Sequence, residues 1–166
     1  GIIKKPVLNQ VLTRIVNVLR SFPFIILMIL LFPLSRKIVG TSIGTTATIV
    51  PLSIAAAPFV ARIIETALKE VDPGVGQAAR AMGSTNMQII WKVLLPEAMP
   101  SLVSGITLTI INLIGYSAMA GAIGGGGLGD LAIRYGYQRF RTDIMAVSVI
   151  VILVLVEVIQ IIGTKM

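Results

Sequence analysis

The sequence predicts an all-α membrane protein with about four transmembrane helices, and two observations lead to this fold class. First, 55% of the 166 residues are hydrophobic, only 13% are charged, and the mean hydropathy is +0.94. A soluble domain of this length does not need so much apolar material for its core. Second, the apolar residues gather into four stretches that approach the roughly 20 residues needed to cross a bilayer core. We therefore expect a single transmembrane domain over residues 1–166.

The first predicted span covers residues 8–34. Its apolar part, "FPFIILMILLFPL" from Phe22 to Leu34, is too short to cross a bilayer alone. The residues before it keep helical spacing of apolar side chains, at Leu8, Val11, Leu12, Ile15, Val18 and Leu19. We expect one helix that begins amphipathic and becomes fully apolar after Arg20.

Three further spans are predicted over residues 40–64, 99–122 and 143–163. The second span is rich in small residues that allow close helix packing, and Pro51 and Pro58 should bend it because each removes a backbone donor. The fourth span carries one acid, Glu157, which is either a proton site or a structural group near the helix end.

The basic residues orient these spans. A topology with both termini and the segment 70–96 in the cytoplasm leaves the loop 123–142 outside. The inner side then carries Lys4, Lys5, Arg14, Arg62, Lys69, Arg80, Lys92 and Lys165, against Arg36, Lys37, Arg134, Arg139 and Arg141 outside. This asymmetry has the direction of the positive-inside rule. The net charge of +7 is thus assigned to membrane boundaries and not to nucleic-acid binding.

The composition excludes several kinds of chemistry. The chain has no cysteine and no histidine, so it lacks thiolate and imidazole metal ligands and the usual general base. A metalloenzyme and a Ser-His-Asp hydrolase are therefore not expected. We assign no catalytic residue, metal or cofactor to this chain.

The segment 70–96 is the one long stretch that is neither strongly apolar nor disordered in composition, and it predicts two short helices. Asp72 is a good N-cap with Pro73 at the first helical position. Gly83 stands where a left-handed C-terminal cap belongs. The first helix should therefore lie between these residues.

The second loop helix should open with Thr85 and Gln88, which have capping-box spacing, and stop before Pro96. Both helices carry an apolar stripe, made of Val75, Ala78, Ala79 and Met82 in the first and Met87, Ile90, Trp91 and Leu94 in the second. These stripes either pack against the ends of the spans or dock into a groove on a cytoplasmic partner.

The segment "QAARAMGSTNMQIIWKVLLPEAMP" resembles the coupling-helix loop, or EAA motif, of ABC importer permeases. That motif is Glu-Ala-Ala, a glycine a few residues on, and then Leu-Pro. Here Gln77 replaces the usual Glu, so a hydrogen bond could stand where an ion pair is expected. The resemblance assigns contact with an ATPase to Gln77, Ala78, Ala79, Met82, Gly83, Met87, Leu95 and Pro96. The small residues Ala78, Ala79 and Gly83 are expected to make the closest approach.

The chain is further similar to the methionine-importer permeases over nearly its whole length. The segments that carry this likeness are "RSFPFIILMILLFPLSRKIVGTSIG", "AAAPFVARIIETAL", "KVLLPEAMPSLV" and "GYSAMAGAIGGGGLGDLAIRYGY". The resemblance implies a type I ABC importer permease fold with five spans in an intact member. In that family the first span lies ahead of the region that this chain matches, so we expect one N-terminal span to be missing and the intact N-terminus to lie outside.

The same resemblance implies the partners. Such permeases work as homodimers in the bacterial cytoplasmic membrane, on two ATPase subunits that bind ATP and magnesium, and receive substrate from an external substrate-binding lipoprotein. The permease moves methionine, as the D or L form, by alternating access and performs no covalent chemistry. The translocation pathway is expected near Asn112, Tyr116, Ser117 and Met119, although Asn112 and Ser117 could instead hydrogen-bond between helices.

Two alternatives stay open at this point. One is the permease of a related ABC importer, for osmoprotectants, phosphonates or polar amino acids. The other is an ion-coupled secondary transporter that uses Glu157 and has no ATPase.

The run "AIGGGGLGD" contains Gly124, Gly126 and Gly129 in the G-x-G-x-x-G spacing of dinucleotide-binding proteins. That fingerprint needs a strand before it, whereas here a long uncharged helix precedes it. No Gly-Lys-Ser or Gly-Lys-Thr follows, so a P-loop is excluded as well. The run is expected to end the third span and to allow tight packing at the outer face, opposite Gly83.

Overall fold

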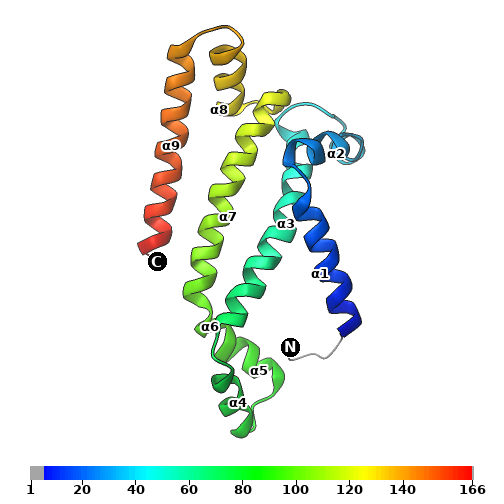
Figure 1. Cartoon of the computed structure of the whole chain (residues 1–166), viewed down its shortest axis with the longest axis vertical. Helices are drawn as coiled ribbons and strands as arrows, with labels where there is room; N and C mark the ends of the chain where they lie inside the picture. Colours follow the sequence, from blue (N-terminus) through cyan, green and yellow to red (C-terminus); the bar gives the residue numbers. More distant parts are fainter. Residues whose placement is uncertain (1–5, 166) are drawn as a thin grey trace.

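The computed structural model describes residues 6–165, and within this range all regular secondary structure is helical. Three long helices form the bundle: α3 (Thr45–Glu70), α7 (Met99–Ala120) and α9 (Thr142–Lys165). Each is long and apolar enough to cross a membrane. α7 runs beside both α3 and α9, and short helices cluster at the two ends of the bundle (Figure 1). The predicted all-α membrane fold is confirmed.

The first predicted span is wrong as a single helix. Residues 8–34 fall into α1 (Pro6–Ser21) and α2 (Phe24–Val39), whose axes differ by 107°. Pro23 causes the break, because its backbone is extended with ψ of 129° and it has no N–H for the helical ladder. The residue before a proline is also disfavoured in the α conformation. The two helices together remain apolar enough to form one broken span.

α2 packs across α3 and α7 near the end of α7. Phe24 and Met28 of α2 are buried with Ala120 in one cluster. The ring of Phe24 stacks on Tyr116, with centroids 4.7 Å apart and an interplanar angle of 12°. This contact holds the bent first segment on the bundle.

α3 and α7 approach closely because small residues lie between them. α3 continues unbroken through Pro51 and Pro58, both of which are buried. A Cβ added at Gly105 of α7 would lie 2.2 Å from Cγ2 of Ile63 on α3. A side chain at this position would therefore push the two helices apart.

The glycine run forms a helical hairpin and not the simple loop expected over residues 123–142. α7 ends in a π-helical turn, after which the chain doubles back and rises again beside α9 (Figure 1). A Cβ added at Gly129 would lie 2.1 Å from the carbonyl oxygen of Ala118, so only glycine lets this segment pack against α7. The segments are η2 (Gly121–Gly125), α8 (Gly127–Asp130) and η3 (Leu131–Tyr137).

The connection from α3 to α7 lies at the opposite end of the bundle from the glycine hairpin, as expected from the order of the spans (Figure 1). It consists of α4 (Pro73–Ala81), α5 (Asn86–Ile89), the π-helical turn η1 (Ile90–Leu94) and α6 (Leu95–Glu97). We call residues 71–98 the connecting loop.

The second helix of this loop does not stop before Pro96, contrary to the expectation. α5 continues through η1 into α6, which contains Pro96. In η1 the N–H of Leu95 donates to the carbonyl oxygen of Ile90, five residues back. A proline in a regular helix clashes with the carbonyl four residues before it, and the wider π turn gives the ring room. The helical path is therefore continuous from the loop toward α7.

Gly129→Ala should destabilise the protein by about 1–3 kcal/mol, because the added methyl group overpacks the contact with α7. Gly115→Ala is the matched control, since its Cβ would meet nothing within 4 Å and alanine favours the helix. Thermal unfolding of the purified protein in detergent measures both. Equal loss of stability in the two variants would contradict the close packing of α8 on α7.

Candidate functional site

The first helix of the connecting loop has the caps that the sequence predicts. Oδ1 of Asp72 accepts a hydrogen bond of 2.7 Å from the N–H of Gly74, and Pro73 opens α4. Gly83 has φ of +83°, in the left-handed region. The N–H groups of Gly83 and Ser84 donate to the carbonyl oxygens of Arg80 and Ala79, which is the Schellman pattern.

The second helix starts with a complete capping box. Oγ1 of Thr85 accepts from the N–H of Gln88, and Oε1 of Gln88 accepts from the N–H of Thr85 at 2.9 Å. The predicted spacing is thus confirmed. Both helices of the loop have fixed ends, so their orientation is set locally.

The connecting loop is seated on the bundle by a small hydrophobic core. Ala67 and Val71 at the end of α3 are buried against Ala98 and Leu102 at the start of α7. Leu68, Leu94 and Leu95 pack around them. Ile89 is only 1% exposed and anchors α5. A displacement of the loop would therefore be transmitted to α3 and α7.

An exposed apolar surface remains on the far side of the loop. Met82 is 79% exposed, Met87 65% and Trp91 62%. Val75 and Ala78 are also exposed. We call these five residues the loop surface. Large apolar side chains exposed on an ordered, non-spanning helical element are candidates for contact with another protein.

The structure divides the residues expected to contact an ATPase. Gln77, Ala78, Met82, Gly83, Met87 and Pro96 are exposed. Ala79 is 3% exposed and Leu95 packs on the loop core, so neither lies on the free surface. The closest-approach role expected for Ala79 does not fit this burial. A side chain at Gly83 would meet no neighbouring atom. Glycine is favoured at this position because the backbone has a left-handed conformation, with φ of +83°.

Sequence reasoning missed two features of this loop. Ile89 is the most buried residue of the second helix, although the predicted apolar stripe contains Ile90 and not Ile89. Trp91 belongs to the stripe but was not selected as a contact residue, and it is largely exposed. The signal in the sequence was a tryptophan, the one in the chain, within a polar loop, since aromatic residues dominate binding energy at interfaces.

A groove of about 420 Å³ lies between α4 and the end of α3. Its lining includes the polar side chains of Gln77 and Arg80 and the apolar side chains of Ile89 and Leu94. Its amide and guanidinium groups can bond an acceptor side chain of a partner. The groove therefore extends the loop surface with polar contacts.

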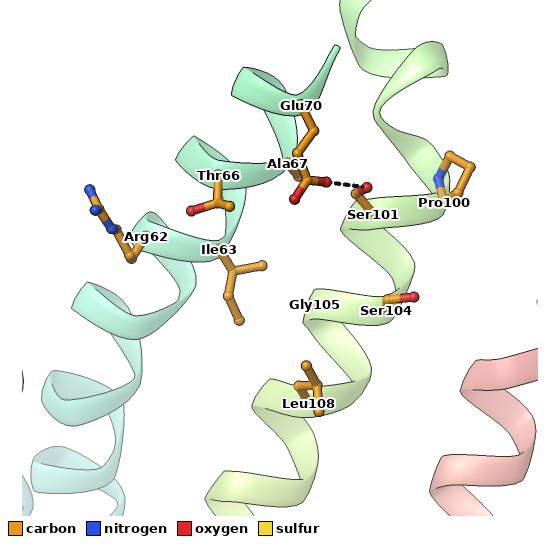
Figure 2. Close-up of a pocket in the computed structure, with 10 residues that line it drawn as sticks. All are labelled: Arg62, Ile63, Thr66, Ala67, Glu70, Pro100, Ser101, Ser104, Gly105 and Leu108. Atoms are coloured by element: carbon orange, nitrogen blue, oxygen red, sulfur yellow. Dashed lines mark hydrogen bonds between the residues drawn. The ribbon is translucent and has the colours of Figure 1, made fainter.

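A second groove, of about 450 Å³, separates α3 from α7 just above the loop (Figure 2). Within it Oγ of Ser101 donates a hydrogen bond of 2.6 Å to Oε2 of Glu70. This bond joins the last turn of α3 to the first turn of α7. Together with the loop core, it ties the loop to both helices.

The four residues expected along the translocation pathway do not form one cluster. Tyr116 stacks on Phe24 and belongs to the core. Asn112 is exposed, and its Nδ2 donates to the carbonyl oxygen of Leu108 in its own helix. Met119 is 47% exposed. Ser117 lines a nearly apolar groove of about 400 Å³ between α3 and α7, together with Ile49, Leu52, Ser53, Ala56, Ile110, Leu113 and Ile114.

Glu157 lies on the exposed side of α9, next to the side that packs on the bundle. α9 is buried at Ser148, and Gly163 packs against Thr107 of α7. Glu157 is eight positions before Lys165, which is about 12 Å along a helix. Within the described residues no ion pair involving Glu157 occurs.

Packed spans joined by a capped helical loop, with apolar side chains exposed at one end of the bundle, define a helical membrane-transport type of domain within the described residues. Residues 1–163 match the family described as "Binding-protein-dependent transport system inner membrane component". The chain belongs to this family and is a multi-pass protein of the inner membrane.

Individual relatives carry more specific names. The probable D-methionine transport system permease protein MetI of Vibrio cholerae is 55% identical over 163 residues, which are 98% of this chain and 72% of the relative. The methionine import system permease protein MetP of Bacillus subtilis is 52% identical over 93% of this chain and 70% of its own length.

Solved structures give the same fold. An inward-facing MetNI methionine ABC transporter matches with a TM-score of 0.95 and 50% identity, over 98% of this chain and 76% of the other. An amino acid ABC transporter solved with histidines has a TM-score of 0.72, over 91% of this chain and 73% of the other. At 22% identity, the latter supports the fold alone. The type I importer permease fold is confirmed.

Gly83→Ala should loosen the connecting loop, because a left-handed alanine costs about 1–2 kcal/mol. Gly76→Ala is the control within α4, where the Cβ meets nothing within 4 Å and the helix gains up to about 1 kcal/mol. Hydrogen exchange of the amides of α4 and α5 in the intact protein measures the effect. Faster exchange only in Gly83→Ala is expected, and unchanged exchange would show that the cap does not hold the loop.

Proposed function

We propose that this chain is the permease subunit of an ATP-driven ABC importer for methionine. The names of relatives at 52–55% identity and the likeness to the MetNI transporter support this substrate. The single observation that carries the mechanism is the loop surface, because Met82, Met87 and Trp91 are exposed on a capped, firmly seated element. Burial of such side chains in a partner groove is favourable.

The partner is a cytoplasmic ATPase, with two copies on a permease homodimer. ATP and magnesium bind to the ATPase. Closure of the two ATPases moves the connecting loops, and each loop carries the ends of α3 and α7 with it through the loop core and the Ser101–Glu70 bond. A small displacement of the connecting loop thereby rearranges the packed helices, and such a rearrangement is the physical basis of alternating access.

The substrate path follows α7. The groove that contains Ser53 and Ser117 is almost entirely apolar and suits a thioether side chain, while the two hydroxyl groups offer hydrogen bonds. Asn112 and Met119 are exposed on the same helix and can line the path. Tyr116 does not line the path. Its ring stacks on Phe24 and packs behind the path, toward the core.

The end of the bundle with the glycine hairpin faces the outside, where an external substrate-binding lipoprotein delivers methionine. This orientation puts the basic residues around the connecting loop in the cytoplasm, as the positive-inside rule requires. The lipoprotein, the ATPases and the second permease are the partners of the working transporter.

Methionine uptake tests this proposal. A strain without its own methionine importer should recover uptake of labelled methionine when this permease is expressed with its ATPase and binding protein. Uptake should stop when ATP is depleted and the proton gradient is kept. Recovery of osmoprotectant, phosphonate or polar amino-acid uptake instead would assign another substrate class, and ATP-independent uptake would favour an ion-coupled carrier.

Trp91→Ser tests the loop surface. Removal of a central aromatic contact should cost about 2 kcal/mol or more, which weakens the affinity for the ATPase roughly thirtyfold. Phe140→Ser is the control, because Phe140 is 88% exposed in the connection between η3 and α9, away from the connecting loop in the chain. Co-purification of the ATPase and methionine uptake are the readouts. Full co-purification with Trp91→Ser would remove the loop surface as the docking site.

A further inference from the structure

The helix α1 lines a groove beside α3 with both apolar and polar residues, and its least exposed side chains are Val16 and Leu19. Asn9, Thr13 and Asn17 line a groove that separates α1 from α3. The opposite side of α1 is apolar and exposed, at Val7, Val11, Ile15 and Val18, which are 49–73% exposed. An exposed apolar side suits a helix whose outer side contacts lipid chains.

α3 contributes charge to the same groove. Nη1 of Arg62 and Nζ of Lys69 lie 2.9 Å and 2.5 Å from the two oxygens of Glu65. Two cations therefore share one carboxylate, which leaves a net positive charge. Figure 2 shows the Arg62 side chain pointing away from α7, and Arg62 is also among the residues that line the groove beside α1.

The groove has room for a headgroup. Its volume is about 540 Å³, and its lining includes two amide side chains and a hydroxyl besides the charged residues. A guanidinium has five donors and an ammonium three, so the bonds to Glu65 leave donors on both Arg62 and Lys69 for another anion. α1 and α3 diverge toward the end of the bundle that carries the connecting loop (Figure 1).

We propose that this groove binds the phosphate of an anionic phospholipid from the cytoplasmic leaflet. The location rests on the proposed orientation, in which the connecting loop faces the cytoplasm. Arg62 and Lys69 bond the phosphate, while Asn9, Thr13 and Asn17 bond its ester oxygens or headgroup hydroxyls. The acyl chains extend from the groove along Leu12 and Val16 of α1, which line it beside the polar groups. Basic pockets between spans on the cytoplasmic side have the chemistry to bind such headgroups.

Lipid retention by the whole transporter tests this site. The permease with its ATPase is reconstituted in equal parts of phosphatidylcholine and phosphatidylglycerol and extracted in detergent, and the retained lipids are quantified by mass spectrometry. The complex should retain phosphatidylglycerol in preference. Arg62→Gln and Lys69→Gln should each lower this retention about fivefold, as expected for a loss of about 1 kcal/mol per basic residue.

Three further variants make the test specific. Glu65→Gln removes the competing carboxylate and should raise retention, which a merely structural role of the ion pairs would not do. Asn17→Leu fills the groove without changing charge and should lower retention. Lys37→Gln, a basic residue in the last turn of α2, should have no effect.

Several outcomes would overturn the site. The first is equal retention of the two lipids, and the second is retention of phosphatidylglycerol that is unchanged in Arg62→Gln and Lys69→Gln. The third is complete displacement of the lipid by inorganic phosphate, which would indicate a site for a free anion. No step of the assay uses methionine, so a failure here is distinguishable from a failure of the proposed transport function.

Discussion

Backbone hydrogen bonding inside the bilayer is the constraint on which this structure depends. No water is available there, so every N–H and C=O must find a partner within the protein, and the chain meets this demand with helices. Prolines and glycines are tolerated where neighbouring helices or altered turns compensate. Pro51 and Pro58 are buried inside a continuous α3, and Pro96 follows a π turn that accommodates its ring. Pro23 has no such compensation, and the chain breaks there.

Close packing at glycines connects the two ends of the bundle. α7 packs on α3 through Gly105 and on α9 through Gly163, and the hairpin after it packs back on its last turns through Gly129. Such close contacts make the helices move as units and not by gradual deformation. The connecting loop sits at the other end of these units, fixed by its own caps and by the Ser101–Glu70 bond. A force on the loop surface thus acts on the helices that enclose the proposed path.

Local features of the connecting loop were predictable from short sequence patterns. The caps at Asp72, Gly83 and Thr85 depend on residues within one turn of each other, so the sequence alone reveals them. The exposed side chains of the loop were only partly predictable. The two apolar stripes included Met82, Met87 and Trp91, which are exposed, but burial of Ala79 depends on how α4 sits against the rest of the loop. The pathway residues Asn112, Tyr116, Ser117 and Met119 separate for the same reason.

Composition and periodicity by themselves determined that this protein is a helical membrane domain, where its long helices lie, and that a capped loop interrupts them, because these properties follow from hydrophobicity and from interactions between near neighbours in the chain. Only the tertiary structure decided that α1 and α2 meet at 107°, that the glycine run becomes a hairpin against α7, and that α1 lines one groove with Arg62 and Lys69. These features depend on contacts between residues distant in sequence, and no local pattern encodes which surfaces will meet.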